Sequence, residues 1–597
     1  MNVFRVSKLG VVTALAVLGA SVGWDRSAFA QEAPAEEGVQ VLTRGPVHEA
    51  FAQTVTFNPE PGIVVPKAPP GAIEELPPDQ RPAGDNVAWI PGYSAWDDDR
   101  SDFLWVSGIW RALPPGRQWV PGYWNQAGQN YQWTSGYWAD ATLSENEYLP
   151  EPPDTVEAGP NIAAPSENHL WTPGCWVWNE NRYAWRPGYW VVAQQNWVWV
   201  PAQYLWCPRG YVFVDGYYDY SVARRGVLFA PVYFNQNVYA RQGYTYSPTM
   251  AISLAVFGNQ LFLRPNYNHY YFGDYYASDY SRGGFYPWFS FNSGGRGYDP
   301  FYAHQRWHHR NDREWQQRVE ADFQYRHDNE DARPPRTLAA QQTLLKSGNI
   351  TNVNNNVNNI VVATSLDQLA QNKDAPVRLQ AVNSEEKQTL AKHGNDMRQF
   401  RSERQKLEAT PATATVGKPS PDFKPARVKL PKSPILAKSA DQLDKDDAPP
   451  KRQDAPTPDL KVEPKARQAT VKGEPPKDKP TTIKAGKPEL PQGKPRETAD
   501  EPKGAPKSAP KAEPKPERPR GEPKPAPKVE PKREPKREPK VEPRVEPKPA
   551  PRVEPKPERP RVEPKPAPKV EPKREPPQDK PRAKDQPKGD DKEKKPK

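Results

Sequence analysis

The stretch WVPGYW at residues 119–124 places a Pro-Gly dipeptide between two tryptophans. Aromatic and β-branched residues around such tryptophans favour strands, as in WVPGYW here and YWVV at 189–192. Pro-Gly is a turn or break signal. The same pattern, W-x-x-G-x-W, recurs along the chain at a nearly fixed spacing, which predicts a repeat architecture. The role of the breaker between the two tryptophans therefore decides the fold.

Five copies of the motif are complete, and four more are degenerate. The complete copies are Trp105, Gly108 and Trp110; Trp119, Gly122 and Trp124; Trp133, Gly136 and Trp138; Trp171, Gly174 and Trp176; and Trp185, Gly188 and Trp190. The degenerate copies begin at Trp89, Trp199, Phe213 and Phe229. Of the 20 tryptophans in the chain, 16 lie between residues 89 and 206, so the repeat region holds most of the large aromatic surface available for a core.

Two geometries explain the break. Residues five apart on an unbroken strand point to opposite faces of a sheet. A bulge with the glycine at positive φ adds one residue and returns both tryptophans to one face. A tight hairpin turn at x-P-G-x opposes them across two strands, again on one face. The bulge is favoured because Pro-Gly suits turn types that splay the strands of a two-residue hairpin. Ser-Gly and Asp-Gly in other copies still allow the hairpin geometry.

Both geometries predict a mainly β fold. We expect an antiparallel meander of Trp-rich repeats of about 14 residues, closing as a barrel or sandwich because a continuous tryptophan face cannot remain in water. The interval 139–168 allows four strands to pack against five. A few helices and a long disordered Pro/Lys/Glu tail should follow.

Residues 89–234 resemble the YXWGXW (WXXGXW) repeat family of bacterial exported proteins, on the motif copies given above. The resemblance implies an exported repeat protein. It implies no reaction and supplies no catalytic residues.

The N-terminus has the pattern of an export signal. Arg5 and Lys8 precede an apolar run at 9–20, and Ala28-Phe29-Ala30 fits the small-x-small rule for cleavage between Ala30 and Gln31. The sequence thus predicts a mature extracytoplasmic protein, periplasmic, secreted or associated with the cell envelope. The apolar run is too short to serve as a mature transmembrane anchor.

Composition divides the chain into six expected segments. These are 1–30, signal peptide; 31–88, a mostly disordered linker; 89–234, the repeat β-domain; 235–300, a Tyr/Gly-rich extension; 301–410, helical and Asn-rich segments; and 411–597, a disordered Pro/Lys/Glu-rich tail.

Two helices are expected in the fifth segment. One is a polar helix at 302–330, and the other spans 384–409 with Asn383 as its N-cap. Apolar residues of the second helix fit either a short coiled coil or an ordinary helix. The Asn-rich stretch at 349–363 suits a strand or a polar low-complexity segment.

The net charge of +11 comes from the C-terminal tail. Residues 501–597 hold 31 basic and 19 acidic residues, whereas residues 1–500 hold 53 and 54. Interleaved Glu and the lack of aromatic residues predict at most weak contacts with anionic polymers and no specific nucleic-acid binding.

Histidines offer one candidate metal site. His304 and His308 lie four residues apart on the expected helix, near His309 and Asp312, and such a pair can share a metal. The solvated Arg and Asp residues around them favour an ordinary surface helix.

A second candidate is the acidic group Asp97-Asp98-Asp99 with Asp102, which can attract Ca²⁺. It lacks the alternating spacing of a calcium loop, so a charged turn is favoured. Cys175 and Cys207 are permitted to pair after export, but strands two apart would hold them beyond bridging distance, which favours free thiols.

No nucleophile, phosphate-binding or metalloprotease motif is present in the sequence. We therefore expect no enzyme, no catalytic residues, no cofactor and no metal. The predicted function is that of a non-enzymatic structural or interaction protein of the cell envelope with a basic Pro-rich spacer. The alternative is a carbohydrate-binding module that uses exposed Trp and Tyr, so the expected partner is an envelope protein or a polysaccharide.

Overall fold

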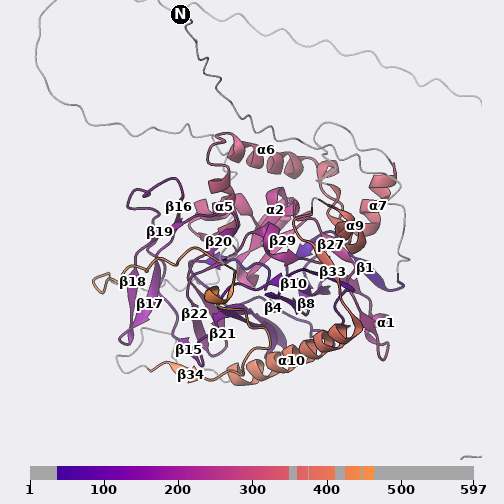
Figure 1. Cartoon of the computed structure of the whole chain (residues 1–597), viewed down its shortest axis with the longest axis horizontal. Helices are drawn as coiled ribbons and strands as arrows, with labels where there is room; N and C mark the ends of the chain where they lie inside the picture. Colours follow the sequence, from indigo (N-terminus) through magenta and orange to yellow (C-terminus); the bar gives the residue numbers. More distant parts are fainter. Residues whose placement is uncertain (1–35, 348–359, 374, 410–423, 445–447, 463–597) are drawn as a thin grey trace, which may run out of the picture. The chain divides into compact units, whose positions relative to one another are not determined.

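Four long β-hairpins form the framework of the protein (Figure 1). The computed structural model describes residues 36–347, 360–373, 375–409, 424–444 and 448–462, all within one unit of the chain, residues 1–479. Each hairpin consists of two consecutive motif copies, and each of its two arms is divided into two strands at the Pro-Gly position. The mainly antiparallel β fold is thus confirmed, and no closed barrel occurs among the described residues.

The strands of the hairpins have the following bounds. The first hairpin comprises β7 (Val87–Ile90), β8 (Tyr93–Asp97), β9 (Asp102–Val106) and β10 (Ile109–Ala112). The second comprises β11 (Arg117–Val120), β12 (Tyr123–Ala127), β13 (Asn130–Thr134) and β14 (Tyr137–Asp140). The third comprises β16 (His169–Thr172), β17 (Cys175–Asn179), β18 (Arg182–Arg186) and β19 (Tyr189–Val192). The fourth comprises β20 (Trp197–Val200), β21 (Gln203–Cys207), β22 (Gly210–Val214) and β23 (Tyr217–Tyr220).

The strand register runs unchanged across each break. In the second hairpin Trp119 faces Trp138 and Trp124 faces Trp133, so both halves keep one alignment and no residue is inserted. The chain reverses at 128–129, between two motifs, as the polar sequence there predicts. Both proposed roles of Pro-Gly, the bulge and the tight turn, are therefore wrong.

Backbone angles agree with this correction. Gly116 and Gly128 have positive φ, but Gly122 and Gly188 do not. The two tryptophans of one motif also fail to share a single aromatic face: Trp119 belongs to the main core cluster, whereas Trp124 packs against the separate cluster that contains Trp133. Because the alternation of side chains continues across the break, the two tryptophan rings of one motif enter different parts of the core.

Residues 36–88 are not a disordered linker, which corrects that prediction for the described part. They contain short strands that pair with distant elements: β1 (Val39–Val41), β2 (Gly45–Pro46), β3 (Val55–Thr56), β4 (Val64–Val65), β5 (Glu74–Glu75) and β6 (Gln80–Pro82). Val47 and Phe51 are completely buried. The segment lacks a period because it threads between the hairpins as extended chain, and a segment of that kind has no single exposed face.

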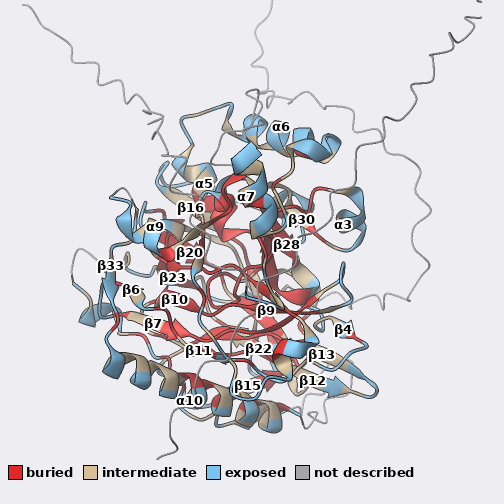
Figure 2. Ribbon diagram, turned by 90° about the vertical axis from the view of Figure 1, so that its right-hand side faces the viewer, coloured by how far each residue is buried: buried red, intermediate tan, exposed pale blue. Residues whose placement is uncertain are grey.

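The Tyr-rich extension also belongs to the core (Figure 2). Its central hairpin is β28 (Leu261–Arg264) with β29 (His269–Phe272), flanked by β2 and β30 (Tyr286–Pro287). Strands β24 (Gly226–Val227) and β25 (Val232–Phe234) lie just before the extension. Shorter elements complete it: α1 (Gln236–Tyr239), β26 (Thr245–Tyr246), β27 (Met250–Ile252), α2 (Val256–Asn259), α3 (Ser278–Arg282), α4 (Trp288–Phe291) and β31 (Gly297–Tyr298).

The expected helices are present. The first divides into α5 (Pro300–His308) and α6 (Trp315–Asp328), and the second is α10 (Ser384–Glu408), whose N-cap Asn383 accepts the Glu386 amide. Helix α10 buries Met397 and Phe400 in the core of its own chain, as the ordinary-helix alternative predicts. Two more helices, α7 (Leu338–Ser347) and α9 (Leu366–Gln371), flank β32 (Ala363–Ser365), and β33 (Leu379–Ala381) pairs with β6. Among the described helices, none combines the length and apolar character needed to cross a membrane.

Residues 424–444 and 448–462 contact the hairpins, so a disordered tail from residue 411 is wrong for these residues. Strand β34 (Ala426–Val428) pairs with β15 (Asn146–Leu149). The Trp119 amide donates to the carbonyl of Ile435, which is buried, and Asp459 exchanges backbone hydrogen bonds with Trp185. The residues of the expected signal peptide, the Asn-rich residues 349–359, residues 410–423 and the sequence after 462 lie outside the described residues.

The described residues between 424 and 462 should contribute measurably to the free energy of unfolding. A chain ending at residue 423 is expected to unfold with about 3 kcal/mol less free energy than one ending at 462, because it loses the buried Ile435 and its backbone hydrogen bonds. Urea unfolding of the two chains measures the difference. Equal stability would show that this segment does not pack as described.

Candidate functional site

A buried glutamate occupies the break in the second hairpin. The amides of Gly122 and Gly136, on the two arms, both donate to the Glu49 carboxylate, at 2.8 and 3.0 Å. Glu49 is 2% exposed, so no solvent can replace it as an acceptor. Buried backbone amides need an acceptor, and here a side chain supplies it where the strand ladder is interrupted.

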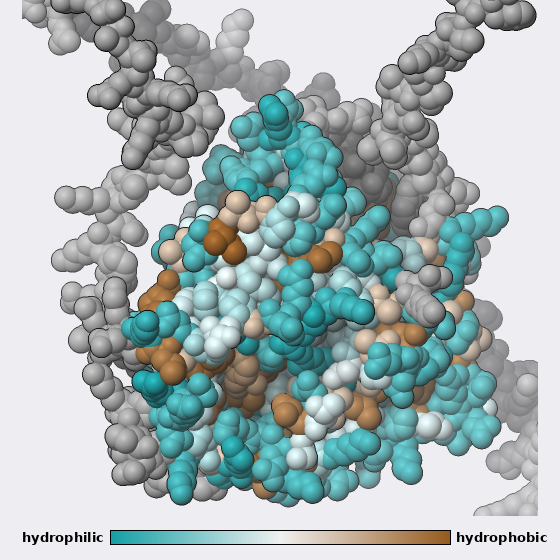
Figure 3. Space-filling view, turned by 60° about the vertical axis from the view of Figure 1, so that its left-hand side comes forward, coloured by the Kyte–Doolittle hydropathy of each residue, from teal (hydrophilic) through white to brown (hydrophobic). Residues whose placement is uncertain are grey.

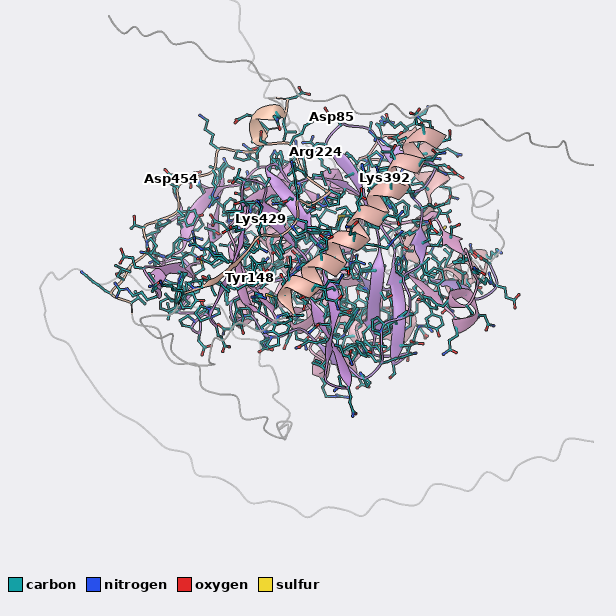
Figure 4. All side chains as sticks on the ribbon, turned by 90° about the horizontal axis from the view of Figure 1, so that it is seen from below. Asp85, Tyr148, Arg224, Lys392, Lys429 and Asp454 are labelled. Atoms are coloured by element: carbon teal, nitrogen blue, oxygen red, sulfur yellow. The ribbon has the colours of Figure 1, made fainter. Side chains whose placement is uncertain are left out.

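A guanidinium completes the same break from the other side. Arg404 of α10 donates from Nη1 to the carbonyls of Pro121 and Ser135, at 2.7 and 3.0 Å. Its partner Glu408 accepts the hydroxyl of Tyr148, and Figure 4 shows α10 crossing the strands with Tyr148 near its C-terminal end. Proline is tolerated at position 121 because it has no amide to leave unpaired.

The first and third hairpins have their own glutamates. Glu75 accepts from the amides of Gly92 and Gly108, at 2.7 and 2.8 Å, and from the Trp105 indole at 3.1 Å. Glu157 accepts from the Gly174 amide at 2.5 Å and the Trp171 indole at 3.0 Å. We call Glu49, Glu75 and Glu157 the carboxylate anchors.

The fourth hairpin carries an acid inside its own motif. Asp215 accepts the Gly216 amide at 2.9 Å and pairs with Arg186 at 3.2 Å. Each of the four breaks is thus provided with a carboxylate.

The motif glycine is required by a tryptophan ring of the opposite arm. A Cβ on Gly122 would lie 2.5 Å from Cζ2 of Trp133, and one on Gly136 would lie 2.7 Å from Cζ2 of Trp119. The glycine is therefore selected by close approach, with no positive φ involved.

Sequence reasoning missed the anchors, although one signal was present. Glu75 precedes Gly92 by 17 residues, and Glu157 precedes Gly174 by the same 17. An acidic residue at a constant offset before a motif pair would have marked both. Glu49 has no such offset, since it lies 73 residues from Gly122.

Burial is the largest influence on the pKa values of Glu49 and Glu75, the two buried carboxylate anchors. It raises the pKa of Glu49 and of Glu75 from the ordinary 4.5 to about 7 in each case, although the glycine amides act in the opposite direction. Burial also lowers the pKa of His48 to about 3 and that of His269 to about 4.

These shifts predict a pH-dependent stability. Below pH 4.5 the Glu49 carboxyl is protonated in both states; between 4.5 and 7 only the unfolded chain releases the proton, so stability is lost as pH rises through that window. The free energy of unfolding of wild type minus that of Glu49→Gln should fall by on the order of 3 kcal/mol from about pH 5 to about pH 8. Subtracting the two free energies removes the opposite pH dependence that His48 and His269 contribute to both chains. Glu60→Gln, at an exposed position, is the control. A difference that stays constant, or rises, would contradict the shift.

The motif tryptophans differ in burial. Those at most 3% exposed are Trp105, Trp110, Trp119, Trp133, Trp138 and Trp176, and Trp185 is 8% exposed. Trp124, Trp171 and Trp190 are only partly buried. Trp171 and Trp190 face each other across β16 and β19, with ring centroids 5.3 Å apart.

This less buried pair lines a groove between the third hairpin and α5. The groove has a volume of about 700 Å³, and the Phe, Tyr and Trp side chains of its lining are Phe57, Trp171, Trp190, Tyr298, Tyr302 and Trp307. Figure 3 brings the side with β16 and β19 forward, where surfaces of intermediate hydropathy lie among hydrophilic side chains. We call this feature the aromatic groove.

Comparison with protein families agrees with this geometry. The family model of the WXXGXW repeat matches in two copies, at residues 84–111 and 168–191. The chain contains the WXXGXW repeat. The two matches fall on the first and third hairpins, the two whose glutamate anchors precede the first glycine by 17 residues. No curated protein and no solved structure matches the chain.

Outside the WXXGXW repeats, the three histidine candidates do not share one site, although the rings of His308 and His309 lie edge to face with centroids 5.2 Å apart. His304 contacts the Gln194 carbonyl at 3.0 Å, His308 is exposed, and His309 stacks on Trp315. Within the described part of the chain, no group of three or more His, Cys, Asp or Glu side chains is arranged to hold a metal.

The acidic turn before β9 is paired with arginines. Arg44 lies 2.7 Å from Asp99, and Arg264 lies 2.6 Å from Asp98. Cys175 and Cys207 are both free thiols.

Proposed function

We propose that this chain is a non-enzymatic, exported structural or interaction protein of the cell envelope, with the WXXGXW repeats as the core of its scaffold. The observation that carries the proposal is the burial of the repeat tryptophans, with Trp110 at 0% and Trp119 and Trp133 at 1% exposure. Rings placed inside the protein stabilise the fold and leave the outer surface free to contact partners.

Export is supported by the N-terminal sequence. A charged start, a short apolar run and the Ala28-Phe29-Ala30 site match a cleaved secretory signal. The Lys- and Pro-rich sequence beyond residue 462 fits a basic spacer that holds the scaffold near a partner in the envelope.

The experiment is expression of the full chain in a bacterium, with separation of cytosolic and envelope fractions. Mass spectrometry of the recovered protein should give Gln31 as the first residue, and cross-linking in the intact envelope should give defined adducts. A chain that keeps Met1 and remains in the cytosol would refute the proposal.

The aromatic groove favours a second candidate, polysaccharide binding. Trp171 and Trp190 form the repeat pair that is left partly exposed, and they lie beside Trp307 in a groove of ligand-binding size. Trp190→Ala should leave thermal unfolding nearly unchanged and remove glycan binding. Trp119→Ala should cost about 3–5 kcal/mol of stability, because that ring is core. If Trp190→Ala unfolds the protein, or leaves glycan binding intact, this candidate fails.

A further inference from the structure

The three tryptophans of the aromatic groove have their polar atoms already satisfied. The Trp171 indole donates to Glu157 at 3.0 Å, that of Trp190 to the Ile162 carbonyl at 3.1 Å, and that of Trp307 to the Glu167 carbonyl at 3.1 Å. These bonds fix the ring orientations. The part of each ring that a ligand can use is therefore its carbon surface, which suits stacking and offers no indole donor.

The charged side chains of the groove are balanced. Its lining contains the acids Glu157 and Glu167 and the bases Arg306 and Arg310. The guanidinium carbon of Arg310 lies 4.9 Å from the centroid of the Trp307 ring, and the Glu157 carboxylate accepts the Gly174 amide. These contacts hold both side chains in the walls of the groove. A groove with equal numbers of acids and bases does not attract a polyanion by its net charge, in contrast to the basic sequence of the tail.

Backbone chemistry also distinguishes the ligand classes. An extended peptide brings one amide and one carbonyl per residue, and each needs a partner once buried. The groove has three indole donors, all of them engaged. A sugar ring presents a face of C–H groups that requires no hydrogen bond, while its hydroxyls can hydrogen-bond to exposed side chains of the lining, which include Arg306 and Glu167.

We propose that the aromatic groove binds an uncharged stretch of polysaccharide, which stacks on Trp171, Trp190 and Trp307. The inference rests on the second candidate function and adds to it the class of glycan and the residues that recognise it. The volume of about 700 Å³ is in the range of sites that enclose ligands of drug size, so the groove holds a short segment of a longer chain.

The test uses the full-length mature protein and soluble polysaccharides of two classes. The neutral probes are dextran, galactomannan and hydroxyethyl cellulose, and the anionic probes are alginate and polygalacturonate. Affinity electrophoresis is run with wild type, Trp190→Ala, Trp307→Ala and the control Trp178→Ala. Trp178 is also partly buried and lies on the same hairpin, in β17, outside the groove lining.

We expect at least one neutral polysaccharide to retard wild type and Trp178→Ala. Its affinity should fall about tenfold or more in each of the two groove variants, with unchanged melting. Binding should also stay constant between about 50 mM and about 500 mM NaCl, because no charge is matched.

The contrary results distinguish a wrong glycan class from an absence of polysaccharide binding. Retardation by the anionic probes alone, lost at high salt, overturns the glycan class and leaves polysaccharide binding standing. A proline-rich peptide that binds wild type but not Trp190→Ala, with no glycan binding, replaces the glycan by a protein partner. Failure of every polysaccharide to bind overturns both this inference and the second candidate function.

Discussion

A chain carrying Glu49→Leu is expected to unfold with about 4 kcal/mol less free energy than wild type. Leucine fills a similar volume but accepts no hydrogen bond, so the amides of Gly122 and Gly136 are left buried without a partner. Each such loss costs about 1–3 kcal/mol. The substitution also removes a carboxylate from the neighbourhood of the buried Arg404.

Urea unfolding at neutral pH measures this effect. Glu60→Leu, at an exposed position of the same segment, is the matched control and should change stability by less than about 0.5 kcal/mol. A Glu49→Leu chain within about 1 kcal/mol of wild type would show that the two amides do not depend on this carboxylate.

Gly122→Ala is expected to destabilise by about 3 kcal/mol. The added Cβ would lie 2.5 Å from Cζ2 of Trp133 and 2.8 Å from the backbone nitrogen of Gly136. A buried ring and a backbone atom cannot both move aside, so the result falls at the high end of overpacking costs.

Two glycines provide the controls for this substitution. Gly258→Ala, in α2, meets nothing within 4 Å and should be nearly neutral. Gly128→Ala also enters open space but at φ +66°, so it reports the cost of backbone strain alone, about 1 kcal/mol. If Gly122→Ala costs no more than Gly128→Ala, close approach of the ring is not what selects the motif glycine.

Local signals in the sequence predicted the repeating part of the structure. The spacing of the motifs, the β-branched residues beside the tryptophans and the Asn383 cap of α10 each act over a few residues. Such signals predicted the antiparallel strands, the reversal at 125–130 and both helical regions. They fail where a structure is completed by distant groups.

The breaks are completed by distant groups of this kind. Glu49 lies 73 residues before Gly122, and Arg404 lies 283 residues after Pro121. The bulge hypothesis accounted for the Pro-Gly dipeptide within a single strand. In the structure, the ladder of backbone hydrogen bonds is interrupted, and a carboxylate and a guanidinium bind there instead. Residues 36–88 supply Glu49 and Glu75, and residues 424–444 and 448–462 pair with strands of the repeat region. Neither part has a periodic pattern, so the sequence there indicates a linker and a tail.

The groove illustrates a second limit. Trp171 and Trp190 have the same motif context as the buried pair Trp119 and Trp138. The first pair lies in a groove between the third hairpin and α5, and such an arrangement of distant elements cannot be read from the local motif.

The central claim is that one carboxylate holds two repeat glycines from opposite arms of a hairpin. Its most direct test is amide hydrogen exchange in protein labelled with ¹⁵N-glycine, comparing wild type with Glu49→Gln and Glu75→Gln. Glutamine keeps only one acceptor oxygen, so we expect Glu49→Gln to accelerate exchange of at least one of Gly122 and Gly136 and to leave Gly92 and Gly108 protected, while Glu75→Gln does the reverse. Exchange of all four glycines that is unchanged in both variants, or accelerated equally in both, would contradict it.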